Sequence, residues 1–109
     1  MEIIFKDISP SDRIMIRTQN SEYRFSVLDP DERRGILTGG SLGNQQRNAV
    51  LVGTLSGGGN SFASDASKLK TGSRALFYLT AKNGVERLIT SIITNLKRSH
   101  SRNEQREAA

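Results

Sequence analysis

The sequence predicts an all-β protein, either a small closed or nearly closed barrel or a two-layer sandwich, with about seven short antiparallel strands. Three observations lead to this prediction. Short apolar runs rich in β-forming residues recur along the chain, turn-forming residues separate them, and helix signals are scarce. The 109 residues are enough for one domain with a single core, which we expect to span residues 1–98.

The first hairpin is expected over residues 13–29, RIMIRTQNSEYRFSVLD. Two β-rich runs flank Asn20-Ser21, which we interpret as a two-residue turn. In that register three cross-strand pairs share the face that points into the core: Ile14 with Val27, Ile16 with Phe25, and Thr18 with Tyr23. The opposite, outer face then places Arg17 directly across from Arg24.

The next turn is expected at residues 29–32, DPDE, because Asp and Pro favour the first two positions of a type I turn. The third strand follows as RRGILTG, residues 33–39, with Ile36 in the core beside Phe25. Residues 41–47 are polar and indicate a loop.

The run NAVLVGTLS, residues 48–56, is apolar on both faces, which is typical of a central strand. Gly53 within it indicates a bulge or the close approach of another backbone. Residues 57–73 are rich in Gly, Ser and Lys, so we expect mostly loop there, with at most one helical turn. The consecutive glycines 57–59 indicate a hairpin corner.

The second hairpin is expected over residues 73–93, with its turn at Asn83-Gly84. That turn sets two cross-strand pairs: Leu79 with Leu88, and Phe77 with Thr90. Both faces carry apolar side chains, whereas a sheet with one solvated face would alternate. Barrel closure or a partner subunit should therefore cover both sides. The outer side supplies the candidate self-association residues, which are Leu76, Tyr78 and Ile89.

Composition and charge limit the possible environments and partners. The formal net charge is +5 and the sequence pI is about 10.1, which favours weak attraction to polyanions. The chain has no cysteine, which excludes disulfides and thiolate metal sites. The N-terminal residues lack the zones of a signal peptide and no apolar run approaches the ~20 residues of a membrane span, so we expect a cytoplasmic protein without a membrane partner. Residues 99–109 are polar and are expected to form a mobile tail.

Three stretches carry a resemblance: IRTQNSEYRFSVLDPDERRGILTGG, GTLSGGG and TSIITNLK. They are similar to a family of short bacterial proteins of uncharacterised function, over roughly Arg13 to Lys97. Members share an Arg-Thr-x-Asn-Ser-x-Tyr hairpin, a Gly-Gly after the third strand, a Gly-Ser/Thr-x-x-Gly-Gly corner and a closing Thr-Ser-x-Val/Ile segment. The resemblance implies a compact β fold and carries no activity with it. Members often have Pro after the closing Thr-Ser, where this chain has Ile92, so the path of the final strand stays open.

No recognisable catalytic, metal or cofactor constellation is present in the sequence. The single histidine, His100, falls in the predicted tail, where it could not be held in reach of a substrate. A P-loop would need Lys and then Ser or Thr where Gly59 and Asn60 stand, although consecutive amides there could still form a small anion nest. The acids of residues 29–32 lack EF-hand spacing. We therefore predict no enzyme activity and no cofactor.

Three arginines are the candidate anion-binding residues: Arg17, Arg24 and Arg33. Arg33, just after the DPDE turn, shares the outer face with the other two in the expected register. Like charges directly opposite each other cost about 0.2–1 kcal/mol. The group is therefore either neutralised by neighbours such as Glu22 or used to bind a phosphate or carboxylate. No aromatic residue interleaves with these arginines, as base stacking on single strands would require.

Two functions follow from these patterns. The first is a small non-catalytic binding or assembly module, which binds itself or another protein through the apolar second hairpin. The alternative is binding of nucleic acid or another polyanion through the arginines.

Overall fold

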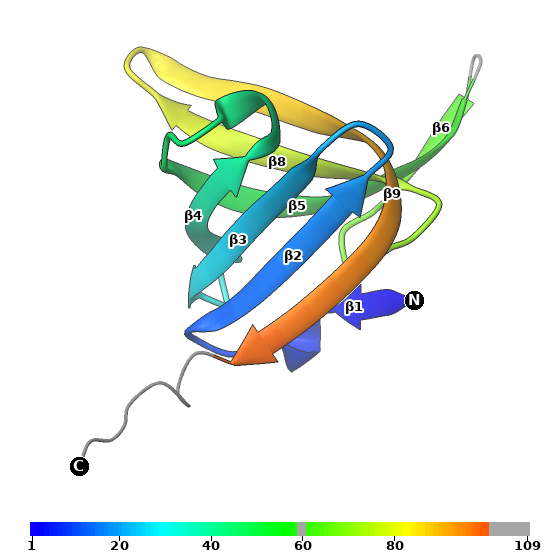
Figure 1. Ribbon diagram of the computed structural model, residues 1–109, viewed down its shortest axis with the longest axis horizontal. Helices are drawn as coiled ribbons and strands as arrows, with labels where there is room; N and C mark the ends of the chain where they lie inside the picture. The colour runs from blue at the N-terminus through cyan, green and yellow to red at the C-terminus, as the bar shows by residue number, and fades with distance from the viewer. Residues whose placement is uncertain (59–60, 101–109) are drawn as a thin grey trace.

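The computed structural model describes residues 1–58 and 61–100 and is all-β, as predicted (Figure 1). The described chain forms two short 3₁₀ helices, η1 (Phe5–Asp7) and η2 (Gly40–Leu42), and nine strands. The strands are β1 (Glu2–Ile4), β2 (Asp12–Thr18), β3 (Glu22–Asp29), β4 (Arg34–Gly39), β5 (Arg47–Gly58), β6 (Ser61–Asp65), β7 (Lys68–Lys70), β8 (Arg74–Ala81) and β9 (Gly84–His100).

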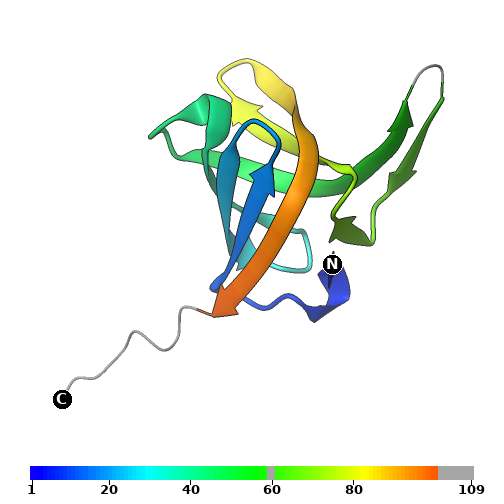
Figure 2. The same ribbon diagram turned by 45° about the vertical axis from the view of Figure 1, so that its right-hand side comes forward.

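Six of the strands close into an antiparallel barrel, in the order β2-β3-β4-β5-β8-β9, and β9 pairs back onto β2. Of the two architectures expected, the structure is the barrel. β6 pairs with the C-terminal part of β5, and the two project from the barrel as an arm (Figure 2). β1 and β7 form a separate two-stranded sheet beside it.

The barrel interior is filled by inward-facing apolar side chains from all six strands. At its centre Phe25 of β3 meets Phe77 of β8, with ring centroids 5.4 Å apart and an interplanar angle of 57°, a geometry favourable for aromatic pairs. Each large side chain buried here contributes about 1.5–3 kcal/mol. Because side chains alternate along a strand, every second residue of these strands faces outward.

The first hairpin turns one residue earlier than predicted. Its turn is Gln19-Asn20, because the Thr18 amide donates to the Ser21 carbonyl at 2.8 Å and the Ser21 amide donates to the Thr18 hydroxyl at 3.0 Å. Each cross-strand partner shifts by two residues as a result. The observed pairs are Ile14 with Phe25 and Ile16 with Tyr23. A shift of two keeps every side chain on its own face, so the expected core face is preserved.

The second hairpin is displaced in the same way. Ala81 lies opposite Gly84, so the turn is Lys82-Asn83 rather than Asn83-Gly84. Gly84 adopts a φ of 138° as the first residue of β9. The observed pairs are Phe77 with Leu88 and Leu79 with Glu86. From Leu76 to Ala81 the two faces keep the residues assigned to them, and a register shift between Arg74 and Leu76 changes the alignment beyond that point.

In β4 the core residue is Leu37, and the prediction that Ile36 enters the core is wrong. Leu37 lies opposite Phe25 and is fully buried. Gly35 shares that inward face, because a Cβ at this position would meet the Phe25 ring at 2.9 Å. Alternation along the strand then places Ile36 on the outer face.

Residues 57–73 contain strands, contrary to the expectation of a loop with one helical turn. β5 continues to Gly58 and pairs with β6, as a hairpin corner requires. Residues 59–60, with the anion nest considered there, lie outside the described chain. At the turn before β7, the hydroxyl and amide of Ser67 donate to the Asp65 carboxylate at 2.5 and 2.8 Å. These bonds lower the pKa of Asp65.

β9 is one continuous strand, which resolves the path of the chain beyond Ile92. It pairs with β8 as far as Ile92 and with β2 from Ile93 to His100. Ser99 and His100, assigned to the tail from the sequence, are therefore the last residues of a barrel strand. The rest of the predicted tail, residues 101–109, lies outside the described chain.

The bulge predicted at Gly53 is present, as a register shift between Leu51 and Gly53 on the β8 side of β5. A Cβ at Gly53 would lie 2.2 Å from the carbonyl oxygen of Asp65. The end of β6 thus rests directly on the Gly53 backbone, and this contact fixes the base of the arm.

Gly53→Ala should lower the free energy of unfolding by about 1–3 kcal/mol more than Gly84→Ala does, the usual cost of overpacking. Gly84 also has a positive φ, but a Cβ there would meet nothing within 4 Å. Urea denaturation followed by circular dichroism measures both losses. Equal losses would show that the arm can move away from residue 53 without cost.

Candidate anion-binding face

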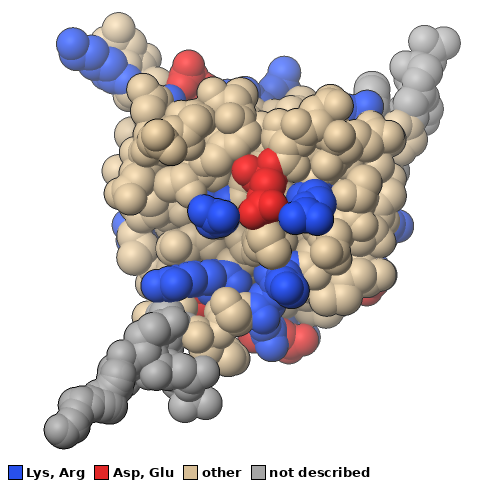
Figure 3. All heavy atoms as spheres, viewed as in Figure 1, with Lys and Arg blue, Asp and Glu red and all other residues tan. Residues whose placement is uncertain are grey.

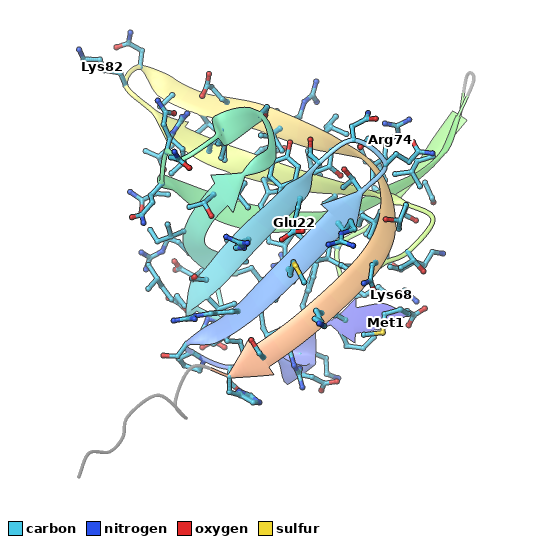
Figure 4. The ribbon with its side chains drawn as sticks, in the orientation of Figure 1. Met1, Glu22, Lys68, Arg74 and Lys82 are labelled. Atoms are coloured by element: carbon cyan, nitrogen blue, oxygen red, sulfur yellow. The ribbon has the colours of Figure 1, made fainter. Side chains whose placement is uncertain are left out.

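The strands β9, β2, β3 and β4 present a continuous outer face (Figure 4). Ile14 and Ile16 of β2 point into the core, so Arg13, Met15 and Arg17 point outward. Strand pairing aligns the outward residues in two neighbouring rows. One row is Lys97, Met15, Arg24 and Thr38, and the next is Ser99, Arg13, Ser26 and Ile36.

A hollow of about 430 Å³ lies over these rows. Met15 and Ile36 are half-buried in it, whereas Arg13, Arg24 and Lys97 are exposed around them. Hydroxyl and amide groups complete the lining, and they belong to Ser26, Thr38, Gln46 and Ser99. The hollow therefore combines an apolar floor with a cationic rim.

Glu22 holds two arginines beside the hollow. Its Oε1 lies 3.1 Å from Arg17 Nη2, and its Oε2 lies 3.4 Å from Arg24 Nη2. Arg17 is directly opposite Glu22, and Arg24 is opposite Met15, so the predicted arginine pair across the hairpin does not form. Figure 3 shows an acidic group between two basic groups near the centre of this view, with further basic groups below it. Glu22 therefore neutralises part of the arginine cluster, which is the first of the two alternatives drawn from the sequence.

Arg33 does not join this group, contrary to prediction. It adopts a left-handed backbone conformation, with a φ of 55°. Its Nη1 donates to the Ala66 carbonyl, and its guanidinium carbon lies 5.2 Å from the centre of the Phe5 ring. This geometry is a cation–π contact that ties the β3–β4 turn to the N-terminal segment.

Two cations of the face, Arg13 and Lys97, were not predicted. Arg13 precedes Arg17 by four residues on the same strand, so the period of two could have placed it on this face. Lys97 joins through the pairing of β2 with β9, which no local pattern specifies. We call Arg13, Arg17, Arg24 and Lys97 the basic face.

The predicted self-association residues lie on the outer side of the barrel formed by β8 and β9. Leu76 is opposite Ile89, and the β8–β9 pairing places Tyr78 opposite Arg87. Tyr78 is 43% exposed and Ile89 is 44% exposed, while Leu76 is half-buried. Barrel closure covers the other side of this hairpin, where Phe77 and its neighbours enter the core. The outer apolar side remains uncovered in the single chain.

Asp12 is the first residue of β2 and lies opposite His100 at one end of the β2–β9 pairing, where it is completely buried. Its Oδ2 accepts a hydrogen bond from the Ser9 amide at 2.9 Å and lies 3.9 Å from Arg98 Nε. His100 Nδ1 contacts its Oδ1. His100 is thus held in a strand, and the premise that placed it in a mobile tail is wrong. The cluster fastens the ends of the two strands that close the barrel.

Asp12→Ala should lower the free energy of unfolding by about 1–3 kcal/mol. The Ser9 amide would lose its acceptor, and the pairing of β2 with β9, which we call the seam of the barrel, would lose the contacts of Asp12 with Arg98 and His100. Asp7→Ala, which removes an exposed carboxylate nearby, is the control. Urea denaturation measures both variants. Equal stability of the two would show that the seam does not depend on the buried carboxylate.

Comparison with known proteins finds no relative, since no family model, no curated protein and no solved structure matches the chain. Within residues 1–58 and 61–100, no helix is long and apolar enough to cross a membrane. The same residues contain no group of three or more His, Cys, Asp or Glu that could hold a metal ion. The functional inference therefore rests on the geometry of the two outer faces.

Proposed function

We propose that the protein is a non-catalytic binding module that holds a phosphate-bearing polyanion on its basic face. The observation that carries this proposal is the convergence of four cations from three neighbouring strands, three of them around one hollow. Arginine suits this task because its guanidinium forms charge-assisted and often bidentate hydrogen bonds to phosphate.

The barrel supports such a role by fixing the cations in space. Arg13, Arg24 and Lys97 stand on paired strands whose inward residues are locked in the core, and sites on strands are more precise than sites on loops. Glu22 holds the guanidinium groups of Arg17 and Arg24 in place without cancelling the charge of the cluster. The net charge of +5 adds long-range attraction for a polyanion.

We propose binding rather than a reaction because of what lines the hollow. In the part of the chain that the structure describes, its lining includes no carboxylate and no imidazole. Of the usual general acids and bases, the described lining includes one lysine, Lys97, and it has no second titratable group of this kind to work with. Arginine, lysine and hydroxyl groups around an apolar floor are the groups expected of a recognition site.

Arg24→Gln combined with Lys97→Gln should weaken binding to heparin and to oligonucleotides. The slope of log K against log salt should fall by about one for each lost phosphate contact. Fluorescence anisotropy at several salt concentrations measures both quantities. The control is Arg87→Gln with Lys82→Gln, which removes the same charge from exposed positions outside the hollow. If both double variants lose affinity equally, binding depends on net charge and the proposed face is wrong.

Self-association is a second candidate function, favoured by the exposure of Tyr78 and Ile89 beside Leu76. Exposed apolar side chains that adjoin one another on a sheet mark an interaction surface more often than isolated ones do. This surface lies on β8 and the first part of β9, whereas the basic face lies on β2, β3 and the last part of β9, so the two functions are compatible.

Tyr78→Lys should convert any oligomer to monomers while the barrel stays folded, because this side chain is exposed in the single chain. Leu28→Lys, on β3, is the matched control, since Leu28 is an apolar residue with 54% exposure away from β8. Sedimentation velocity measures the oligomeric state. A wild-type protein that is monomeric at every concentration would exclude this second function and leave the first untouched.

A further inference from the structure

The hollow on the basic face has an apolar floor, which phosphate binding alone does not require. Met15 stands directly between Lys97 and Arg24 in one cross-strand row, and Ile36 ends the next row. Both are half-buried and both line the hollow, together with part of Ile14. A ligand that fills this space must carry an apolar or flat group close to its negative charges.

We propose, building on the function proposed above, that the hollow receives an unstacked nucleobase, so that the polyanion is single-stranded nucleic acid. The base lies on Met15 and Ile36, and the adjoining phosphates bind Arg13, Arg24 and Lys97. The volume of about 430 Å³ lies within the usual range of small-ligand pockets. A nucleotide unit brings the required combination of a flat, weakly polar ring and flanking phosphates.

A duplex fits this face less well. The base edges of a duplex lie inside grooves, and proteins read them with a protruding helix or β-ribbon. Here the strands that carry the basic face form a hollow, so a duplex would touch the rim cations through its backbone and leave the floor empty. A single strand can turn a base out of its stack and into the hollow.

The lining also indicates how selective the hollow is. Met15 has a flexible, polarizable side chain that adapts to different shapes. Ser26 and Thr38 carry hydroxyl groups, which donate and accept hydrogen bonds equally well. Such groups tolerate any base, so the site should distinguish single strands from duplexes without a strong sequence preference. The floor takes the place of the aromatic platforms used by other single-strand binders.

The test compares three labelled ligands by fluorescence anisotropy at matched salt concentrations. They are a mixed-sequence DNA strand of roughly a dozen nucleotides, within the span of one small barrel, an abasic sugar-phosphate strand of equal length, and the corresponding duplex. The natural strand should bind about tenfold more tightly than the abasic strand, at the low end of what one base contact is worth, and the duplex should resemble the abasic strand. Equal affinity for natural and abasic strands would overturn the base-binding inference and leave polyanion binding intact. No binding of any ligand at low salt would overturn both proposals.

Variants of the floor sharpen this test. Met15→Ser should reduce affinity for the natural strand to the abasic level without changing the affinity for the abasic strand or the salt slope. Met15→Leu should preserve the difference in affinity between the natural and the abasic strand, because leucine keeps the apolar contact with the base. Leu28→Ser, at an apolar residue of β3 outside the hollow, is the control, and thermal unfolding verifies that each variant is folded. If Met15→Ser weakens the abasic strand equally, Met15 merely positions the neighbouring cations and the inference is wrong.

Discussion

The pairing of β2 with β9 is the interaction on which the rest of the structure depends. It joins the first and the last strand of the barrel, with registers from Asp12 opposite His100 to Thr18 opposite Ile93. Without it the meander would be an open sheet with two unpaired edges and a core exposed along one side. The same pairing brings Lys97 beside Met15, so closure of the barrel and completion of the basic face are one event. The buried carboxylate of Asp12 lies at the end of this seam and ties it to the Ser9 amide and to Arg98.

The electrostatic arrangement on the basic face follows from one carboxylate shared by two arginines. An exposed ion pair of this kind contributes roughly 0–1 kcal/mol to stability. Its larger effect is on position, since Arg17 and Arg24 would otherwise sample many rotamers before meeting a ligand. Restricting them beforehand reduces the entropy lost on binding. In the proposed function Glu22 is therefore part of the binding surface, although its charge opposes that of a polyanion.

Local patterns predicted much of the fold, and their errors fall at the turns and at contacts between distant segments. Both hairpins and the inner and outer faces of the first one were predicted correctly because alternation is a strong local signal, whereas Ile36 of β4 was assigned to the wrong face. Both turns were placed one residue late, because Asn20-Ser21 and Asn83-Gly84 are favourable turn sequences. In the first hairpin the hydrogen bond of the Thr18 hydroxyl sets the register, and in the second the conformation of Gly84 does. Arg17 and Arg24 could be found from their hairpin. Lys97, the place of His100 and the contacts of Arg33 depend on distant segments, and no local pattern specifies those.

The long sequence separation between β2 and β9 also affects how the chain folds during its synthesis. Synthesis proceeds from the N-terminus, so β2 must wait until β9 has emerged before its free edge is paired. During that interval the nascent sheet exposes Ile14, Phe25 and Leu37 together with unpaired backbone groups, the condition under which β-proteins aggregate. The charged outer residues of β2 act against this aggregation, because Arg13 and Arg17 place repelling charges on the unpaired edge strand and so discourage a second unfinished chain from docking there. The residues proposed to attract a nucleic acid would thus also protect the protein while it folds.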